Sequence, residues 1–102
     1  MSEIVWSDAW FLLAVEYAAD ESGVATKEAV MKTGDFINHA IFMQTEIDHA
    51  LQVLSDRDLV YKKEETFVLG ASFKKFWDSS GAEKHRAVHK QLEKVESALG
   101  TA

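Results

Sequence analysis

The sequence contains no cysteine, which excludes disulfide bonds and thiolate metal sites. It also contains no proline, as suits a chain made mostly of helix. The N-terminal segment lacks the basic and apolar regions of a secretion signal. The apolar run near it is interrupted by Glu16 and is too short to span a bilayer. We therefore expect a cytoplasmic protein of bacterial style with no membrane contact.

The sequence also lacks the motifs of common catalytic sites. Its five glycines are scattered and form no phosphate-binding loop, and no nucleophile motif is present. His85, His89 and Glu93 recur at four-residue spacing and would share one helical face that suits a divalent metal. No other ligand is near them in the sequence, so the alternative is an ordinary surface helix. We expect no enzyme, no catalytic residues, no metal and no cofactor.

The composition is that of an ordinary globular protein, with 47% hydrophobic and 27% charged residues in a chain of 102. The net charge of −6 is unevenly distributed. Residues 1–30 carry −5, residues 31–70 carry −3, and residues 71–102 carry +2. Nonspecific DNA binding depends on neutralising phosphates, so the acidic part of the chain argues against it.

Apolar spacing predicts two helices in the first third of the chain. In residues 5–20, Trp10, Leu13, Ala14 and Tyr17 recur at helical spacing and form an inward stripe, with Ser7 as the N-cap. Residues 25–34 form a shorter helix that is capped by Thr26 and closed by Gly34. Residues 35–44 are too short for a solitary helix, and we expect an irregular connector that buries its apolar side chains: Phe36, Ile37, Ile41 and Phe42.

A third helix is expected to begin at Thr45, with Thr45 and Asp48 forming a variant capping box. Its predicted buried face consists of Ile47, Ala50, Leu51 and Leu54.

Two alternating segments then predict a hairpin over residues 59–70, with apolar contributions from Leu59, Tyr61, Phe67 and Leu69. The turn at residues 64–65 lacks glycine and asparagine, which favours a longer loop. The tail from residue 71 is helical again, as two helices or as one helix weakened at Gly81.

The order of three helices, a hairpin and a further helix resembles the winged helix-turn-helix family of bacterial transcriptional regulators. The resemblance is most specific in "ALQVLSDRDLVYKKEETFVLG", where a helix with apolar core positions leads into a charged wing and a return strand. It covers residues 5–76 and implies a mainly α fold with a small β-hairpin and an additional C-terminal helix. We expect a winged-helix domain over residues 1–79, followed by a C-terminal helix over residues 80–102.

The resemblance implies that the third helix is a recognition helix and that the hairpin is a wing. The candidate DNA contacts are then Thr45, Glu46, His49, Gln52, Lys62 and Lys63. Glu46 and Asp48 are acidic, and the wing has no net charge, so the alternative is a solvated face. The predicted function is a DNA-binding transcriptional regulator. The alternative function is a winged-helix module that binds a protein through an acidic surface and does not contact DNA.

The tail carries a short apolar stripe with the spacing of two heptads, formed by Val88, Leu92, Val95 and Leu99. A stripe of this length is too short for an isolated coiled coil. We expect it to form the interface of a symmetric homodimer, the commonest oligomer. The alternative is that the stripe packs on the first helix of its own chain.

Overall fold

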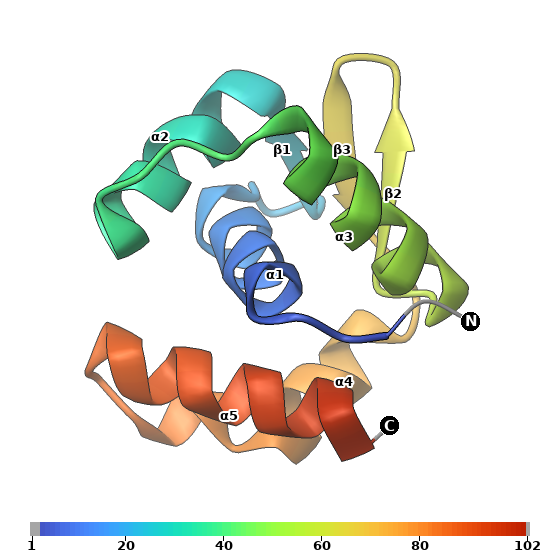
Figure 1. The fold of residues 1–102 in the computed structure, drawn as a ribbon. Helices are drawn as coiled ribbons and strands as arrows, with labels where there is room; N and C mark the ends of the chain where they lie inside the picture. The colour runs from blue at the N-terminus through green and yellow to red at the C-terminus, as the bar shows by residue number, and fades with distance from the viewer. Residues whose placement is uncertain (1–2, 102) are drawn as a thin grey trace.

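A computed structural model describes residues 3–101. The described chain is mainly helical, with a small antiparallel sheet. Figure 1 shows α1 running through the middle of the molecule, with α2, α3 and the sheet on one side and α4 and α5 on the other. The elements are α1 (Trp6–Ala18), β1 (Val24–Thr26), α2 (Lys27–Asn38), α3 (Gln44–Asp56), β2 (Val60–Lys63), β3 (Thr66–Leu69), α4 (Phe73–Ser80), η1 (Ala82–Lys84) and α5 (Val88–Thr101).

Helix α1 is the centre of the hydrophobic core. Every residue from Asp8 to Val15 is buried, because other elements cover the helix from both sides. The predicted one-sided stripe is therefore wrong: Phe11 and Leu12 are as buried as Leu13, whereas Tyr17 is 39% exposed. A helix that is apolar all round needs neighbours on several faces, and this need explains its central place.

The start of α1 differs from the sequence prediction. The helix begins at Trp6, and Val5 rather than Ser7 is the capping residue. The Asp8 carboxylate accepts a hydrogen bond from the Val5 backbone N–H at 2.9 Å. Asp8 thus satisfies one of the backbone donors that are free at a helix start, and it does so from inside the core.

The sheet has three antiparallel strands in the order β1-β3-β2. Strand β1 was not predicted from the sequence, because it has only three residues and pairs with a strand about 40 positions later. The turn between β2 and β3 contains two residues, because Lys63 pairs with Thr66. The predicted longer loop is therefore wrong, and Glu64 accommodates the tight turn with a positive φ of 55°. Val60 faces the core, whereas the expected contributor Tyr61 is 42% exposed.

Helix α2 continues past the predicted end. Thr26 caps its start as expected, accepting a hydrogen bond from the Ala29 N–H at 3.1 Å. Gly34 lies inside the helix, which ends at His39 in the left-handed conformation. The Gly34 carbonyl accepts a hydrogen bond from Trp10 Nε1 at 2.9 Å, and the Phe42 ring lies where a Cβ on Gly34 would be. Gly34 therefore allows close packing and does not end the helix.

Helix α3 presents the predicted apolar stripe to the core. Ile47, Ala50 and Leu54 are buried, and Leu51 is half-buried against the core. The helix begins at Gln44, so Thr45 is not the N-cap. The Glu46 carboxylate instead accepts a hydrogen bond from the Met43 backbone N–H at 2.8 Å.

The tail forms two helices, one of the two arrangements that the sequence left open. Gly81 separates them in the left-handed conformation, with a φ of 77°. Helix α5 then returns along α1 and completes the core. Among the described residues, no helix is long and apolar enough to cross a membrane.

Two acidic side chains, Glu16 of α1 and Glu83 of η1, repel each other. Burial of Glu16 and the nearby charge of Glu83 raise the pKa of the Glu16 carboxyl above its ordinary value of 4.5. The folded state therefore prefers protonated Glu16, and ionisation of Glu16 destabilises the fold at neutral pH.

We predict that Glu16→Gln raises the free energy of unfolding at pH 7, by less than about 1 kcal/mol. The gain should shrink as the pH falls through the pKa of folded Glu16 and vanish below the unfolded value, where both variants are neutral. Urea unfolding of the two proteins between pH 3 and pH 8 measures this difference. A gain that is constant over this range would contradict the assignment to ionisation.

Candidate interaction surfaces

The structure places the four predicted DNA contacts of α3 in different environments. Thr45 and Gln52 are exposed. Glu46 is half-buried and holds the Met43 backbone N–H. His49 is hydrogen bonded through Nδ1 to a carboxylate oxygen of Asp8 at 2.8 Å. Glu46 therefore supports the start of α3, and His49 supports the attachment of α3 to α1.

The Asp8–His49 contact joins a fully buried carboxylate to a ring that is 33% exposed. Asp8 also accepts the Val5 N–H, so both of its oxygens are bonded. A buried carboxylate needs such partners, since an unpaired charge in a protein interior is costly. His49 is accordingly a structural residue of the α1–α3 contact, which the sequence pattern could not show because the two residues are 41 positions apart.

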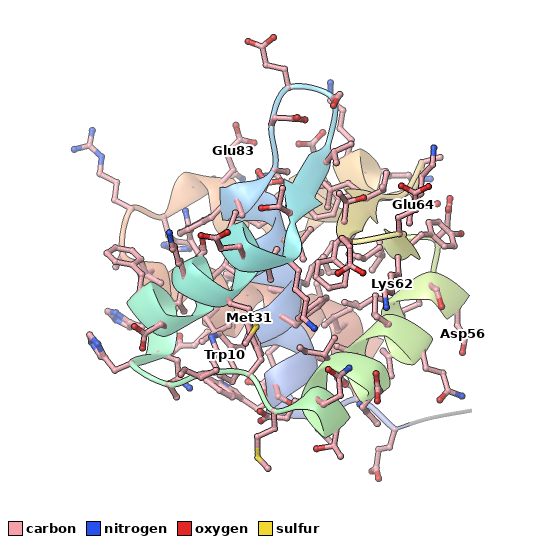
Figure 2. All side chains as sticks on the ribbon, turned by 90° about the horizontal axis from the view of Figure 1, so that it is seen from above. Trp10, Met31, Asp56, Lys62, Glu64 and Glu83 are labelled. Carbon is pink, nitrogen blue, oxygen red and sulfur yellow. The ribbon has the colours of Figure 1, made fainter. Side chains whose placement is uncertain are left out.

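The hairpin brings Lys62 beside α3, as Figure 2 shows. Lys62 lines a small hollow of about 40 Å³ with Lys27 from the start of α2 and with Gln44 and Asp48 from α3. We call this region the α3–hairpin face (Lys27, Gln44, Asp48 and Lys62). Lys62 and Lys63 are exposed, but so are Asp48, Glu64 and Glu65. The face therefore combines two lysines with one aspartate, and the two glutamates of the hairpin turn offset Lys62 and Lys63.

The last turn of α2 and the segment between α2 and α3 expose large apolar side chains. Phe36, Ile41 and Met43 are 68%, 69% and 65% exposed, and we call these three residues the connector surface. The prediction that Phe36 and Ile41 are buried is wrong. Six of the eight residues 36–43 are apolar, more than one short segment can bury on a single side.

The connector surface is held by a buried anchor. Phe42 is 4% exposed and stacks on Trp10, with ring centroids 3.8 Å apart. Phe42 is thus fixed in the core, whereas its neighbours Ile41 and Met43 are exposed. Trp6 meets Trp10 in a tilted arrangement, and its 39% exposure adds apolar surface to the same aromatic group.

The sequence around the connector surface is mainly acidic, with the exception of Lys32, which lies one helical turn before Phe36 on α2 and is ion-paired with Glu28. Residues 33–56 contain no lysine or arginine, but they contain Asp35, Glu46, Asp48 and Asp56. Asp35 precedes Phe36, and Glu46 and Asp48 follow Met43 by a few residues. The arrangement can bind apolar groups that come with positive charge.

The predicted dimer residues lie in the core of their own chain. Leu92, Val95 and Leu99 are 8%, 0% and 1% exposed, and Val88 is half-buried against the same core. Their helix packs on α1, which is the alternative arrangement given by the sequence. A dimer formed through these side chains would first have to remove them from the core. The homodimer therefore stays a prediction, and the apolar stripe proposed as its interface is not exposed.

The histidines of the tail do not share a helical face. His85 lies before the start of α5, whereas His89 and Glu93 lie within it. Within residues 3–101, no group of three or more histidine, cysteine, aspartate or glutamate side chains is placed to hold a metal ion.

Comparisons of the chain with protein-family models, with curated proteins and with solved structures find no match.

Proposed function

We propose that this chain is a winged-helix module that binds a protein partner through the connector surface. The observation that carries the proposal is the exposure of Phe36, Ile41 and Met43 within eight residues. Single exposed apolar residues are common on protein surfaces. A group of three large side chains, each about two-thirds exposed, is typical of a binding surface.

The winged-helix assignment is supported by the element order and by the sheet. Three helices precede a two-stranded hairpin, and a short strand between α1 and α2 joins the hairpin as its third member. The hairpin lies beside α3, where the resemblance in the sequence expects a wing. Fold alone does not determine function, so the choice of ligand depends on the surface chemistry.

The chemistry of the proposed partner follows from the charge. Since residues 33–56 carry acids and no lysine or arginine, a complementary segment has apolar side chains with lysine or arginine beside them. A second copy of this chain offers the same acids, which would repel each other across a symmetric contact. We therefore assign the connector surface to a different, basic protein.

DNA binding is the second candidate function. It is favoured by the two lysines that the fold brings to one face, Lys27 and Lys62, and by exposed Lys63 next to them in the hairpin. It is disfavoured by the neighbouring acids Asp48, Glu64 and Glu65, which repel phosphates. His49, a predicted base contact, is bonded to Asp8. Binding of a basic protein does not have to overcome this repulsion between acids and phosphates.

The test compares two surfaces of the purified protein. The triple variant Phe36→Ser, Ile41→Ser, Met43→Ser should lose at least about tenfold in affinity for a partner isolated with the wild-type chain, as is usual when apolar anchors are truncated. Tyr61→Ser is the matched control, because Tyr61 is an exposed aromatic residue of the hairpin. The affinity of Tyr61→Ser for the partner should equal that of the wild-type chain. High salt should weaken the complexes that the wild-type chain and Tyr61→Ser form with the partner.

Two results would contradict the proposal. The first is a DNA gel shift at low salt that Lys62→Gln, Lys63→Gln abolishes and the triple variant leaves intact. The second is a wild-type dimer in the ultracentrifuge that the triple variant converts to a monomer, since a second copy would then occupy the connector surface.

A further inference from the structure

A second feature of the surface is an open cavity of about 260 Å³ near the end of α3. It is lined by residues of the α3–β2 connection, by Ser72 just before α4 and by α4 itself. The lining residues are Arg57, Leu59, Ser72, Lys75, Phe76 and Ser79. The connector surface contributes none of them, so the cavity is independent of the proposed protein-binding site.

The charged side chains of the cavity lining are both cations. Arg57 and Lys75 line it, and no carboxylate does. Ser79 adds a hydroxyl group, while the Ser72 hydroxyl already donates to Asp58 at 2.9 Å. Leu59 and Phe76 supply apolar walls. The cavity thus combines positive charge with an apolar lining, a combination that suits a small amphipathic anion.

Arg57 has an unused hydrogen-bond donor. Its Nη1 donates to the Val53 carbonyl at 3.2 Å, which holds the guanidinium at the end of α3. Its Nε is buried and has no hydrogen-bond partner within the part of the chain that the structure describes. A buried donor without a partner is unfavourable. A small rotation of the guanidinium toward an anionic oxygen in the cavity would supply the missing acceptor.

From these observations we infer that the cavity is a binding site for a small carboxylate with an apolar body. Planar guanidinium groups match the geometry of carboxylates, and Leu59 and Phe76 accommodate the rest of the ligand. The volume lies just below the range of about 300–1,000 Å³ that drug-sized ligands occupy. The ligand is therefore about the size of a single aromatic ring with one carboxylate.

Titration of the isotope-labelled full chain with sodium benzoate, followed by NMR, tests the inference. The amide signals of Ser72, Phe76 and Ser79 should shift and saturate, with a Kd on the order of 1 mM or below for a ligand of this size. Benzyl alcohol, which keeps the ring and lacks the charge, should bind at least about tenfold more weakly.

Variants separate the two cations from general effects of charge. Arg57→Gln should weaken benzoate binding by about tenfold, as expected for loss of a charge-assisted hydrogen bond. Lys75→Gln should weaken it by about threefold and, because Lys75 is exposed, should fold even if the Arg57 variant does not. Lys84→Gln is the control, since Lys84 is exposed and lies outside the cavity lining.

Several outcomes would overturn the inference. Shifts that do not saturate would show that the cavity does not bind the carboxylate. Equal binding of benzyl alcohol, or an equal loss in Lys84→Gln, would show that the cavity cations do not recognise the charge. Tighter binding of inorganic phosphate than of benzoate would assign the cavity to a different class of anion.

Discussion

Replacing Gly34 with alanine is expected to lower the free energy of unfolding by about 2–3 kcal/mol, the usual cost of overpacking a core. The new Cβ would lie 2.2 Å from Cε2 of Phe42, far inside van der Waals contact. Phe42 cannot move freely, because it stacks on Trp10 and meets Phe11 edge-on. Alanine is normally the better helix residue by about 1 kcal/mol, so a loss of stability here would identify the ring contact as its cause.

Gly100→Ala is the matched control for this prediction. Gly100 also lies in a helix, and a Cβ added to it meets nothing within 4 Å. Its stability should be unchanged or higher by up to about 1 kcal/mol. Chemical denaturation of both variants measures the contrast. Phe42→Leu should partly rescue Gly34→Ala, and equal stabilities of the two alanine variants would contradict the packing of α2 against the connector.

Replacing Asp8 with alanine should destabilise the protein by about 2–4 kcal/mol, which combines a lost helix cap with a lost charge-assisted hydrogen bond. Asp8 is fully buried and accepts from the Val5 N–H and from His49. His49→Ala should also destabilise the protein, because the remaining carboxylate keeps only one of its two partners. Thermal and urea unfolding of both variants provide the measurement.

A double-mutant cycle isolates the Asp8–His49 contact. The double alanine variant should cost about 1–3 kcal/mol less than the sum of the two single variants, because each substitution already removes the shared bond. Asp56→Ala, at an exposed aspartate near the end of α3, should change stability by less than about 0.5 kcal/mol. Strict additivity of Asp8→Ala and His49→Ala would contradict a direct interaction.

The parts of the fold that follow from local apolar spacing could be predicted from the sequence. The stripe of α3 at Ile47, Ala50 and Leu54 and the hairpin after it depend on short-range periodicity, and the structure contains both. The strand β1 could not be predicted in this way, because three residues carry little pattern and its partner β3 is distant in the sequence.

The largest error in the sequence analysis concerned Gly34, and it affected the candidate site. A glycine near the end of an apolar segment is usually a helix terminus. Here it is needed for contact with Phe42, so α2 continues to Asn38 and the connector becomes shorter than expected. Phe36 thus lies in α2 and Ile41 in the shorter connector, and both are exposed. The connector surface therefore depends on contacts of Phe42 with Gly34 and with Trp10, which is distant in the sequence, and no local pattern contains them.

The predicted DNA contacts show a similar limit. Helical spacing placed His49 on the outer face of α3, but spacing does not indicate that the buried carboxylate of Asp8 lies within 2.8 Å. Lys62 lies on the hairpin as predicted, and Asp48 was known to be acidic, yet only the fold shows that the two residues line the same hollow. Charge balance on a surface is a tertiary property, and this balance favours a protein ligand over DNA.

The most direct test of the central claim is site-specific photo-crosslinking in cells that produce the protein, with the reactive group placed at Ile41 or at Gln52. Both residues are exposed, one on the connector surface and one on the outer face of α3. We expect Ile41 to yield an adduct with a protein whose crosslinked peptide, identified by mass spectrometry, contains apolar residues beside lysine or arginine. Gln52 should yield no nucleic-acid adduct. DNA adducts at Gln52 without a protein adduct at Ile41 would contradict the account.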